Sequence, residues 1–169
     1  MADVAPGLRA RAEAWIAVDP DPGTRAELEG LLADGDAAAL EERFAGRLAF
    51  GTAGLRGTMG AGPTRMNRLV VRQSAAGIAR HLLAEVAGAA RAGVVVANDA
   101  RHHSAEFATD CAEVLSAHGI RVIRAPAPVP TPVGVFAVRH LGCAAGIVVT
   151  ASHNPPSDNG LKLYMGDGA

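Results

Sequence analysis

Short apolar runs and segments of helical periodicity alternate from residue 93 to the end of the chain. We predict strands in the apolar runs, at residues 93–97, 120–123, 144–150 and 161–164. Single helices separate the first three of these runs and are expected to be capped by Ser104 and by Thr131. Strands that are apolar throughout and separated by single helices are typical of a parallel sheet. The sequence therefore predicts an α/β fold in which helices sandwich a mainly parallel sheet.

Residues 1–49 are predicted to form an N-terminal helical extension without evident chemistry. Apolar residues at helical spacing indicate a helix over residues 7–18. Thr24 is expected to cap a second helix, because Glu27 three residues later completes a capping box. Asp36 is expected to cap a third helix.

The helical pattern ends at the glycine-rich residues 50–60, since such a segment is too flexible to form a helix. A long helix is expected after it, from Asn67 to about Ala90. We therefore divide the chain at this point and predict a second domain over residues 50–169.

The composition argues against several classes of partner. A formal net charge of −1 offers no basic excess for a nucleic acid, and an aromatic content of 4% offers few stacking platforms. The sequence has no run of about 20 apolar residues that could span a membrane, and no signal peptide is expected. Cys111 and Cys143 lack metal-ligand spacing and are expected to be buried thiols in a reducing cytosol. We therefore expect a cytoplasmic protein that binds neither nucleic acid nor membrane.

Two polar clusters follow predicted strands, at residues 98–103 and 152–159. The functional loops of parallel sheets lie beyond the carboxyl ends of the strands, where both clusters fall. Ser152 comes directly after a buried strand, in a loop that prolines restrict. It is either a nucleophile or phosphoryl carrier, or a serine that makes a local turn bond. Its context, Ala-Ser-His, differs from the Gly-x-Ser-x-Gly of α/β-hydrolases and argues against that class.

Three motifs carry a resemblance to a known family. Residues 150–162, TASHNPPSDNGLK, resemble the active-serine signature of the α-D-phosphohexomutase superfamily. Residues 50–57, FGTAGLRG, resemble its glycine-rich segment, and residues 99–104, DARHHS, resemble its D-x-R-x-x-S turn. Residues 62–67, GPTRMN, look most like the α-phosphoglucomutase/phosphopentomutase branch. The resemblance implies that residues 50–169 are domain I of such an enzyme, incomplete at its C-terminal end.

The resemblance implies an intramolecular phosphotransferase that works through a phosphoserine at Ser152. The phosphoserine would donate its phosphoryl group to a sugar monophosphate and take the other phosphoryl group back from the bisphosphate intermediate. The net result would be the interconversion of sugar 1-phosphate and 6-phosphate. Glucose phosphate is the expected substrate, with mannose or pentose phosphate as alternatives, and a sugar bisphosphate is the expected activator.

The resemblance also implies roles for residues around Ser152. Arg56 would approach the phosphoryl oxygens with its donor fork, and Lys162 would be the general acid/base for the sugar hydroxyl. His153 would either bond the phosphoryl group or support the loop, and Asn154 would hold the turn.

Further residues are expected to bind substrate or to support the loop. Asp99 and Arg101 could pair and brace the Ser152 loop from the next strand end. We favour loop support for Asp99 and a polar active-site rim for Arg101. Asn159, within the serine signature, is expected to belong to the same group.

The resemblance implies Mg²⁺ as the cofactor, with an oxygen of Ser152 or of its phosphoryl group as one ligand. The family's other ligands come from a D-x-D-x-D-R loop in a second domain, and this sequence has no such run. Downstream domains of the same protein are therefore expected as partners, and the 169-residue chain alone is expected to show no more than trace activity. The alternative is a catalytically incomplete stand-alone domain that acts as a phosphosugar-binding or regulatory module.

Overall fold

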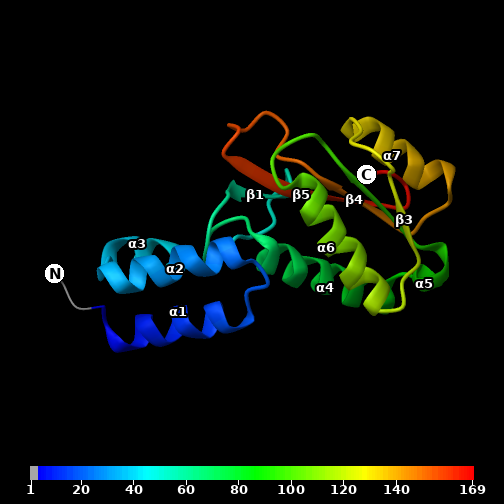
Figure 1. Cartoon of the computed structure of the whole chain (residues 1–169). Coiled ribbons are helices and arrows are strands. Elements are labelled where there is room, and N and C mark those ends of the chain that lie inside the picture. Colours follow the sequence, from blue (N-terminus) through cyan, green and yellow to red (C-terminus); the bar gives the residue numbers. More distant parts are fainter. Residues whose placement is uncertain (1–3) are drawn as a thin grey trace.

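The computed structural model describes residues 4–169 (Figure 1). The helices are α1 (Pro6–Val18), α2 (Pro22–Asp34), α3 (Ala37–Phe44), α4 (Arg68–Glu85), α5 (Ala89–Ala92), α6 (Ser104–Ala117) and α7 (Thr131–His140). The strands are β1 (Leu55–Thr58), β2 (Val94–Asn98), β3 (Val122–Arg124), β4 (Ala145–Val149) and β5 (Asp158–Met165). Among these described helices, none combines the length and the apolar character needed to cross a membrane.

The strands form one sheet in the order β1-β5-β4-β2-β3. The central strand β2 runs parallel to both β3 and β4, as the alternation of strands and helices predicts. The strand β5 pairs antiparallel with β4, and β1 pairs antiparallel with β5 at the edge. The α/β class is confirmed, and the sheet is mixed.

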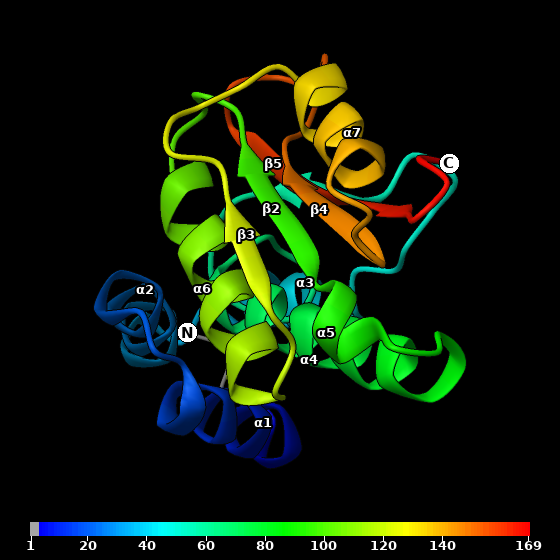
Figure 2. The same ribbon diagram turned by 90° about the vertical axis from the view of Figure 1, so that its right-hand side faces the viewer.

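Helices cover both faces of the sheet (Figure 2). Alternate strand residues point to opposite faces, so Val94 and Val96 pack in the core that contains Leu115 of α6. Val95 points to the other face, where it packs against Val138 of α7. On the first face, α4 packs against α6 as a further layer. The structure therefore has the helix–sheet–helix sandwich that the sequence predicts.

The helix α7 lies unusually close to the sheet at Gly146 of β4. A Cβ atom at this position would lie 2.3 Å from Cγ2 of Val138. Such a distance is far below van der Waals contact, so only a glycine allows this approach.

We expect Gly146→Ala to lower the free energy of unfolding by about 2 kcal/mol, because the added methyl group must push α7 off the sheet. Urea denaturation measures this change. Gly30→Ala in α2 is the matched control, since a Cβ atom there meets nothing within 4 Å. The control should stabilise the protein by about 0.5–1 kcal/mol through helix propensity. Equal stability of the two variants would contradict the packing argument.

The helices α1, α2 and α3 pack against one another on the side of α4 (Figure 1). Trp15 of α1 contacts Phe44 of α3 edge to face, with ring centroids 6.2 Å apart. Glu27 of α2 accepts a hydrogen bond from the main-chain N–H of Ala61 at 2.9 Å and pairs with Arg43 at 2.7 Å. These contacts tie the helical extension to the segment that follows β1. The exact division of the chain at residue 50 stays a prediction.

Several predicted helix ends were wrong. The second helix begins at Pro22, and its N-cap is Asp21, whose carboxylate accepts the N–H of Gly23. Thr24 therefore lies inside the helix, because an Asp-Pro pair provides both a cap and a first helical residue upstream of it. The cap predicted at Asp36 is confirmed, since its carboxylate accepts the N–H of Ala39.

Other boundaries shift for local reasons. Ser104 and Thr131 are the first residues of their helices and not the caps. The long helix α4 ends at Glu85, well before Ala90, and Gly88 in the left-handed conformation separates it from α5. Within the glycine-rich segment, residues 55–58 form the strand β1, because their main chain pairs with β5.

Candidate active site

The loop between β4 and β5 presents Ser152 at the carboxyl end of β4. Ser152 is partly buried and has a φ of 56°, in the left-handed region that side chains rarely adopt. Its main-chain N–H donates to Oγ1 of Thr150 at 2.9 Å. Among the hydrogen bonds of residues 4–169, none uses Oγ of Ser152. The local turn bond is therefore made by the main chain, and the hydroxyl is left for chemistry.

Arg101 holds this loop in place. Its Nη1 and Nη2 atoms donate to main-chain carbonyls of the loop at 2.7–3.1 Å, those of Ser152, Asn154, Pro155 and Asp158. Its Nε lies 3.5 Å from Oδ2 of Asp99. We expected Arg101 at a polar rim, whereas its guanidinium contacts the main chain of the loop.

Asp99 and Asn159 join the two polar clusters. Oδ1 of Asp99 accepts hydrogen bonds from the main-chain N–H of Arg101 at 3.0 Å and from the hydroxyl of Ser104 at 2.7 Å. Asn159 is fully buried, and its Nδ2 donates to the carbonyl of His102 at 2.8 Å and to Oγ of Ser104 at 3.0 Å. The turn after β2 and the Ser152 loop therefore form one connected network, as expected for neighbouring strand ends.

Arg56 reaches the Ser152 loop from the edge strand β1. Its Nε donates to the carbonyl of Ala53 at 3.0 Å, and its Nη1 donates to Oδ1 of Asn154 at 3.2 Å. Nδ2 of Asn154 in turn donates to Oδ2 of Asp158 at 2.9 Å, so Asn154 holds the turn. This bond, with a further one from Thr58, keeps the pKa of Asp158 below its usual value. Asp158 is therefore an ionised anchor of the loop.

Gly160 allows β1 to approach the loop this closely. Gly160 is opposite Arg56 in the antiparallel pairing of β1 with β5. A Cβ atom on Gly160 would lie 2.5 Å from the carbonyl oxygen of Leu55 and 2.8 Å from Cγ of Arg56. A larger residue would push the arginine away from the Ser152 loop.

Lys162 and Arg56 line one hollow of about 290 Å³. Lys162 lies on β5 opposite Val148 and is partly buried. The glycine-rich residues 50–54 also line this hollow. Two cationic side chains that share a small hollow favour an anionic ligand.

His153 stands apart from these contacts. Its side chain is exposed, and no hydrogen bond described for residues 4–169 involves its ring. Loop support by His153 therefore has no contact in its favour, whereas the bond to a phosphoryl group stays a prediction.

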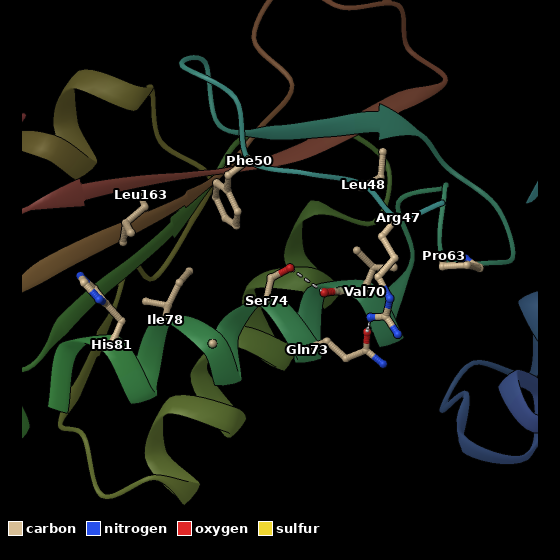
Figure 3. Close-up of a pocket in the computed structure, with 11 residues that line it drawn as sticks. Arg47, Leu48, Phe50, Pro63, Val70, Gln73, Ser74, Ile78, His81 and Leu163 are labelled. Atoms are coloured by element: carbon tan, nitrogen blue, oxygen red, sulfur yellow. Dashed lines mark hydrogen bonds between the residues drawn. The ribbon is translucent and has the colours of Figure 1, made fainter. Parts of the chain in front are cut away.

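A separate groove of about 410 Å³ lies along α4 (Figure 3). Val70 and Ile78 of α4 face Phe50 and Leu163 across it. Its lining is mainly apolar and includes neither Ser152 nor Arg56 nor Lys162. The groove therefore lacks the groups for phosphoryl transfer, and the candidate site is the polar edge at Ser152.

Several residues that support the site were not predicted from the sequence. Thr150 accepts the N–H of Ser152, Thr58 donates to Asp158, and Ser104 links Asp99 with Asn159. Thr150 belongs to the serine motif and Ser104 to the D-x-R-x-x-S turn, so both could have been found there. No sequence pattern points to Thr58, because its contact with Asp158 depends on the pairing of β1 with β5.

The described residues contain no cluster of metal-ligating side chains. Within residues 4–169, no group of three or more His, Cys, Asp or Glu side chains could hold a metal ion. The metal ligand expected at Ser152 stays a prediction.

Residues 47–169 match the family model of the phosphoglucomutase/phosphomannomutase alpha/beta/alpha domain I. The chain belongs to this family. A probable phosphoribomutase of Schizosaccharomyces pombe is 43% identical over 163 residues, which are 96% of this chain and 28% of that protein. A phosphoglucomutase of Staphylococcus haemolyticus is 45% identical over 129 residues, which are 76% of this chain and 23% of that protein.

A solved structure in the phosphoglucomutase/phosphomannomutase family has the same fold. This protein of Burkholderia thailandensis superposes with a TM-score of 0.59 at 33% identity, over 71% of this chain and 26% of that one. The chain thus spans only about a quarter of the length of the relatives that it matches. The three sequence motifs of the resemblance all lie within the stretch that matches the family model.

Proposed function

We propose that this chain is the phosphoserine-bearing part of a phosphosugar mutase that interconverts sugar 1-phosphates and 6-phosphates. The observation that carries the proposal is the Ser152 hydroxyl, which has no hydrogen bond within residues 4–169 and lies on a loop that Arg101 and Asp158 hold. Phosphoryl transfer depends on positioning and on the neutralisation of oxygen charge, and this edge of the sheet supplies both. Membership of the mutase family supports the same reaction.

Each transfer in the proposed reaction exchanges one P–O bond for another. The sugar hydroxyl attacks the phosphoserine, the bond from phosphorus to Oγ of Ser152 breaks, and Lys162 accepts the hydroxyl proton. In the second transfer Oγ of Ser152 attacks the other phosphoryl group, and Lys162 returns its proton to the sugar oxygen that leaves. Arg56 donates hydrogen bonds to the phosphoryl oxygens, and His153 can contribute another.

Mg²⁺ is part of the proposal, because a divalent ion neutralises charge on phosphoryl oxygens when it is bound. Ser152 or its phosphoryl group supplies one ligand, and the others are expected from downstream domains of the same protein. A sugar bisphosphate is the proposed activator that loads Ser152. We also place the protein in the cytoplasm.

Glucose phosphate is the first proposed substrate, on the basis of the motif at residues 62–67. The name of the S. pombe relative, a probable phosphoribomutase, supports pentose phosphate as the second candidate, and mannose phosphate is the third. The sugar-selecting residues are expected outside this chain, so the choice must be made by experiment.

The test is an isomerisation assay of the full-length protein with glucose, ribose and mannose phosphates as separate substrates. We expect conversion of glucose or ribose phosphate that requires Mg²⁺, stops with EDTA, and is started by a small amount of the matching sugar bisphosphate. The 169-residue chain in parallel should show no more than trace activity. Phosphosugar binding without conversion of any of the three would contradict the mutase proposal and favour the alternative of a binding module.

A further inference from the structure

Two arginines contact the Ser152 loop, and they use their N–H groups differently. A guanidinium has five N–H donors and no acceptor. In Arg101 each terminal nitrogen, which has two N–H groups, contacts two main-chain carbonyls of the loop. The remaining donor, on Nε, faces the carboxylate of Asp99 at 3.5 Å. The terminal nitrogens of Arg101 therefore have no N–H group to spare for a ligand.

Arg56 is only partly engaged. Its Nε donates to Ala53 and its Nη1 to Asn154, which uses two of the five donors. Within residues 4–169 the other three, two on Nη2 and one on Nη1, have no protein acceptor. Arg56 also lines the hollow that contains Lys162, so these donors can reach an anion bound there.

The contacts of Arg101 act on the conformation of the serine itself. A left-handed backbone costs a non-glycine residue roughly 1–2 kcal/mol. Nη2 of Arg101 holds the carbonyls of Ser152 and Asn154 on either side of His153 at 2.9 and 2.7 Å. Because both oxygens are drawn to one nitrogen, the main chain between them is kept folded. This contact offsets the cost of the φ of 56° at Ser152.

We propose a division of labour in which Arg101 is a positioning residue that imposes the left-handed backbone of Ser152, while Arg56 binds the phosphoryl group. The part of Arg56 rests on the proposed function, and the part of Arg101 concerns the conformation of the loop alone. Lysine cannot replace Arg101, because all three of its N–H donors are on one nitrogen atom and cannot contact four carbonyls at once. Lysine can partly replace Arg56, since a point charge still attracts phosphate.

The first test measures the loop directly, by amide hydrogen exchange in the 169-residue chain. In the native structure the main-chain N–H groups of Ser152, Asn154 and Asp158 donate hydrogen bonds within the loop. Arg101→Lys should speed hydrogen exchange at these three groups at least about tenfold. Exchange in β2 and β4 should stay unchanged and serves as the control for folding. Arg56→Lys should leave all of these rates unchanged. Slow loop exchange in Arg101→Lys would overturn the proposal.

A rescue experiment separates conformation from general stability. Glycine adopts the left-handed conformation without cost, so adding Ser152→Gly to Arg101→Lys should slow the exchange at Asn154 and Asp158 again, to within about threefold of the native rate. The single variant Ser152→Gly should exchange like the native chain. Failure of the double variant to recover, with β2 and β4 intact, would show that Arg101 does not act through the backbone of Ser152.

Kinetics of the full-length mutase complete the test. Arg101→Lys should lower kcat by about 10²-fold, because the phosphoryl group is misplaced, and should leave KM within about twofold since no substrate contact is lost. Arg56→Lys should lower kcat by at least about tenfold through the loss of charge-assisted hydrogen bonds to the phosphoryl group, while loop exchange stays native. A rise in KM for Arg101→Lys would overturn its positioning role. If the native protein converts no sugar phosphate, the proposed function fails, and the exchange experiments still decide the role of Arg101.

Discussion

Replacing Ser152 by alanine is expected to lower the kcat of the proposed full-length mutase by about 10⁴-fold or more, because the residue that we propose as the phosphoryl carrier is lost. The effect should be this large because no neighbouring hydroxyl can take over. Thr150 points its oxygen at the N–H of Ser152, and Ser157 donates its hydroxyl to Asp158. Two measurements check the prediction: initial rates of sugar phosphate isomerisation, and intact mass after treatment with the sugar bisphosphate.

Ser157→Ala is the matched control for this experiment. Ser157 lies in the same loop, is exposed, and has its own hydroxyl bonded 3.2 Å from Oδ1 of Asp158. Its removal should change kcat by no more than about threefold. The native protein and Ser157→Ala should each gain one phosphate, and Ser152→Ala should gain none. Phosphate on Ser152→Ala would place the carrier elsewhere.

Asp110→Ala is expected to lower the free energy of unfolding by about 3 kcal/mol. Asp110 of α6 is fully buried, and it accepts two hydrogen bonds at 2.8 Å from Arg68 of α4. Nη1 of Arg72 donates to the same carboxylate at 2.7 Å. The hydrogen bond to Asp110 also raises the pKa of Arg68 above its ordinary value. Removal of the carboxylate therefore leaves two arginines between α4 and α6 without their shared anion.

Glu113→Ala tests whether burial is the cause. Glu113 pairs with Arg72 at 2.9 Å, but its side chain is 56% exposed. An exposed pair of this kind contributes about 1 kcal/mol or less. Urea denaturation of both variants should place the midpoint of Asp110→Ala well below that of Glu113→Ala. Similar midpoints would show that the buried carboxylate adds nothing beyond a surface ion pair.

The strands β2 and β4 were predictable because burial on both faces requires apolar residues at every position. Val94, Val95 and Val96 satisfy this requirement, and so do the residues of β4. The position of Ser152 followed from the same logic, since it comes directly after such a strand.

The edge strand β1 was not predictable in this way. Its four residues include Gly57, which has low strand propensity, and the charged Arg56. They become a strand because β5 offers a main-chain partner a hundred residues later in the sequence. A local pattern contains no information about that partner.

The contacts of Arg101 with the main chain of the loop could not be predicted from the sequence, for a different reason. Its acceptors are main-chain carbonyls, which every residue has and which therefore leave no trace in the residue types. Only the path of the loop brings four of these oxygens to one guanidinium. The buried carboxylate of Asp110 is a similar case, because α4 and α6 meet through the fold and not through sequence spacing.

The pairing of β1 with β5 has a consequence for biosynthesis. The contact of Arg56 with Asn154 spans 98 residues, and that of Thr58 with Asp158 spans 100. A ribosome must therefore synthesise the chain as far as β5 before β1 finds its partner, and contacts between such distant segments form slowly. Until then β1 is an unpaired strand, the kind of segment that aggregates. The sheet edge at Ser152 is thus expected to close last, so a nascent chain arrested before β5 would hold the α4–α6 layer but not the candidate site.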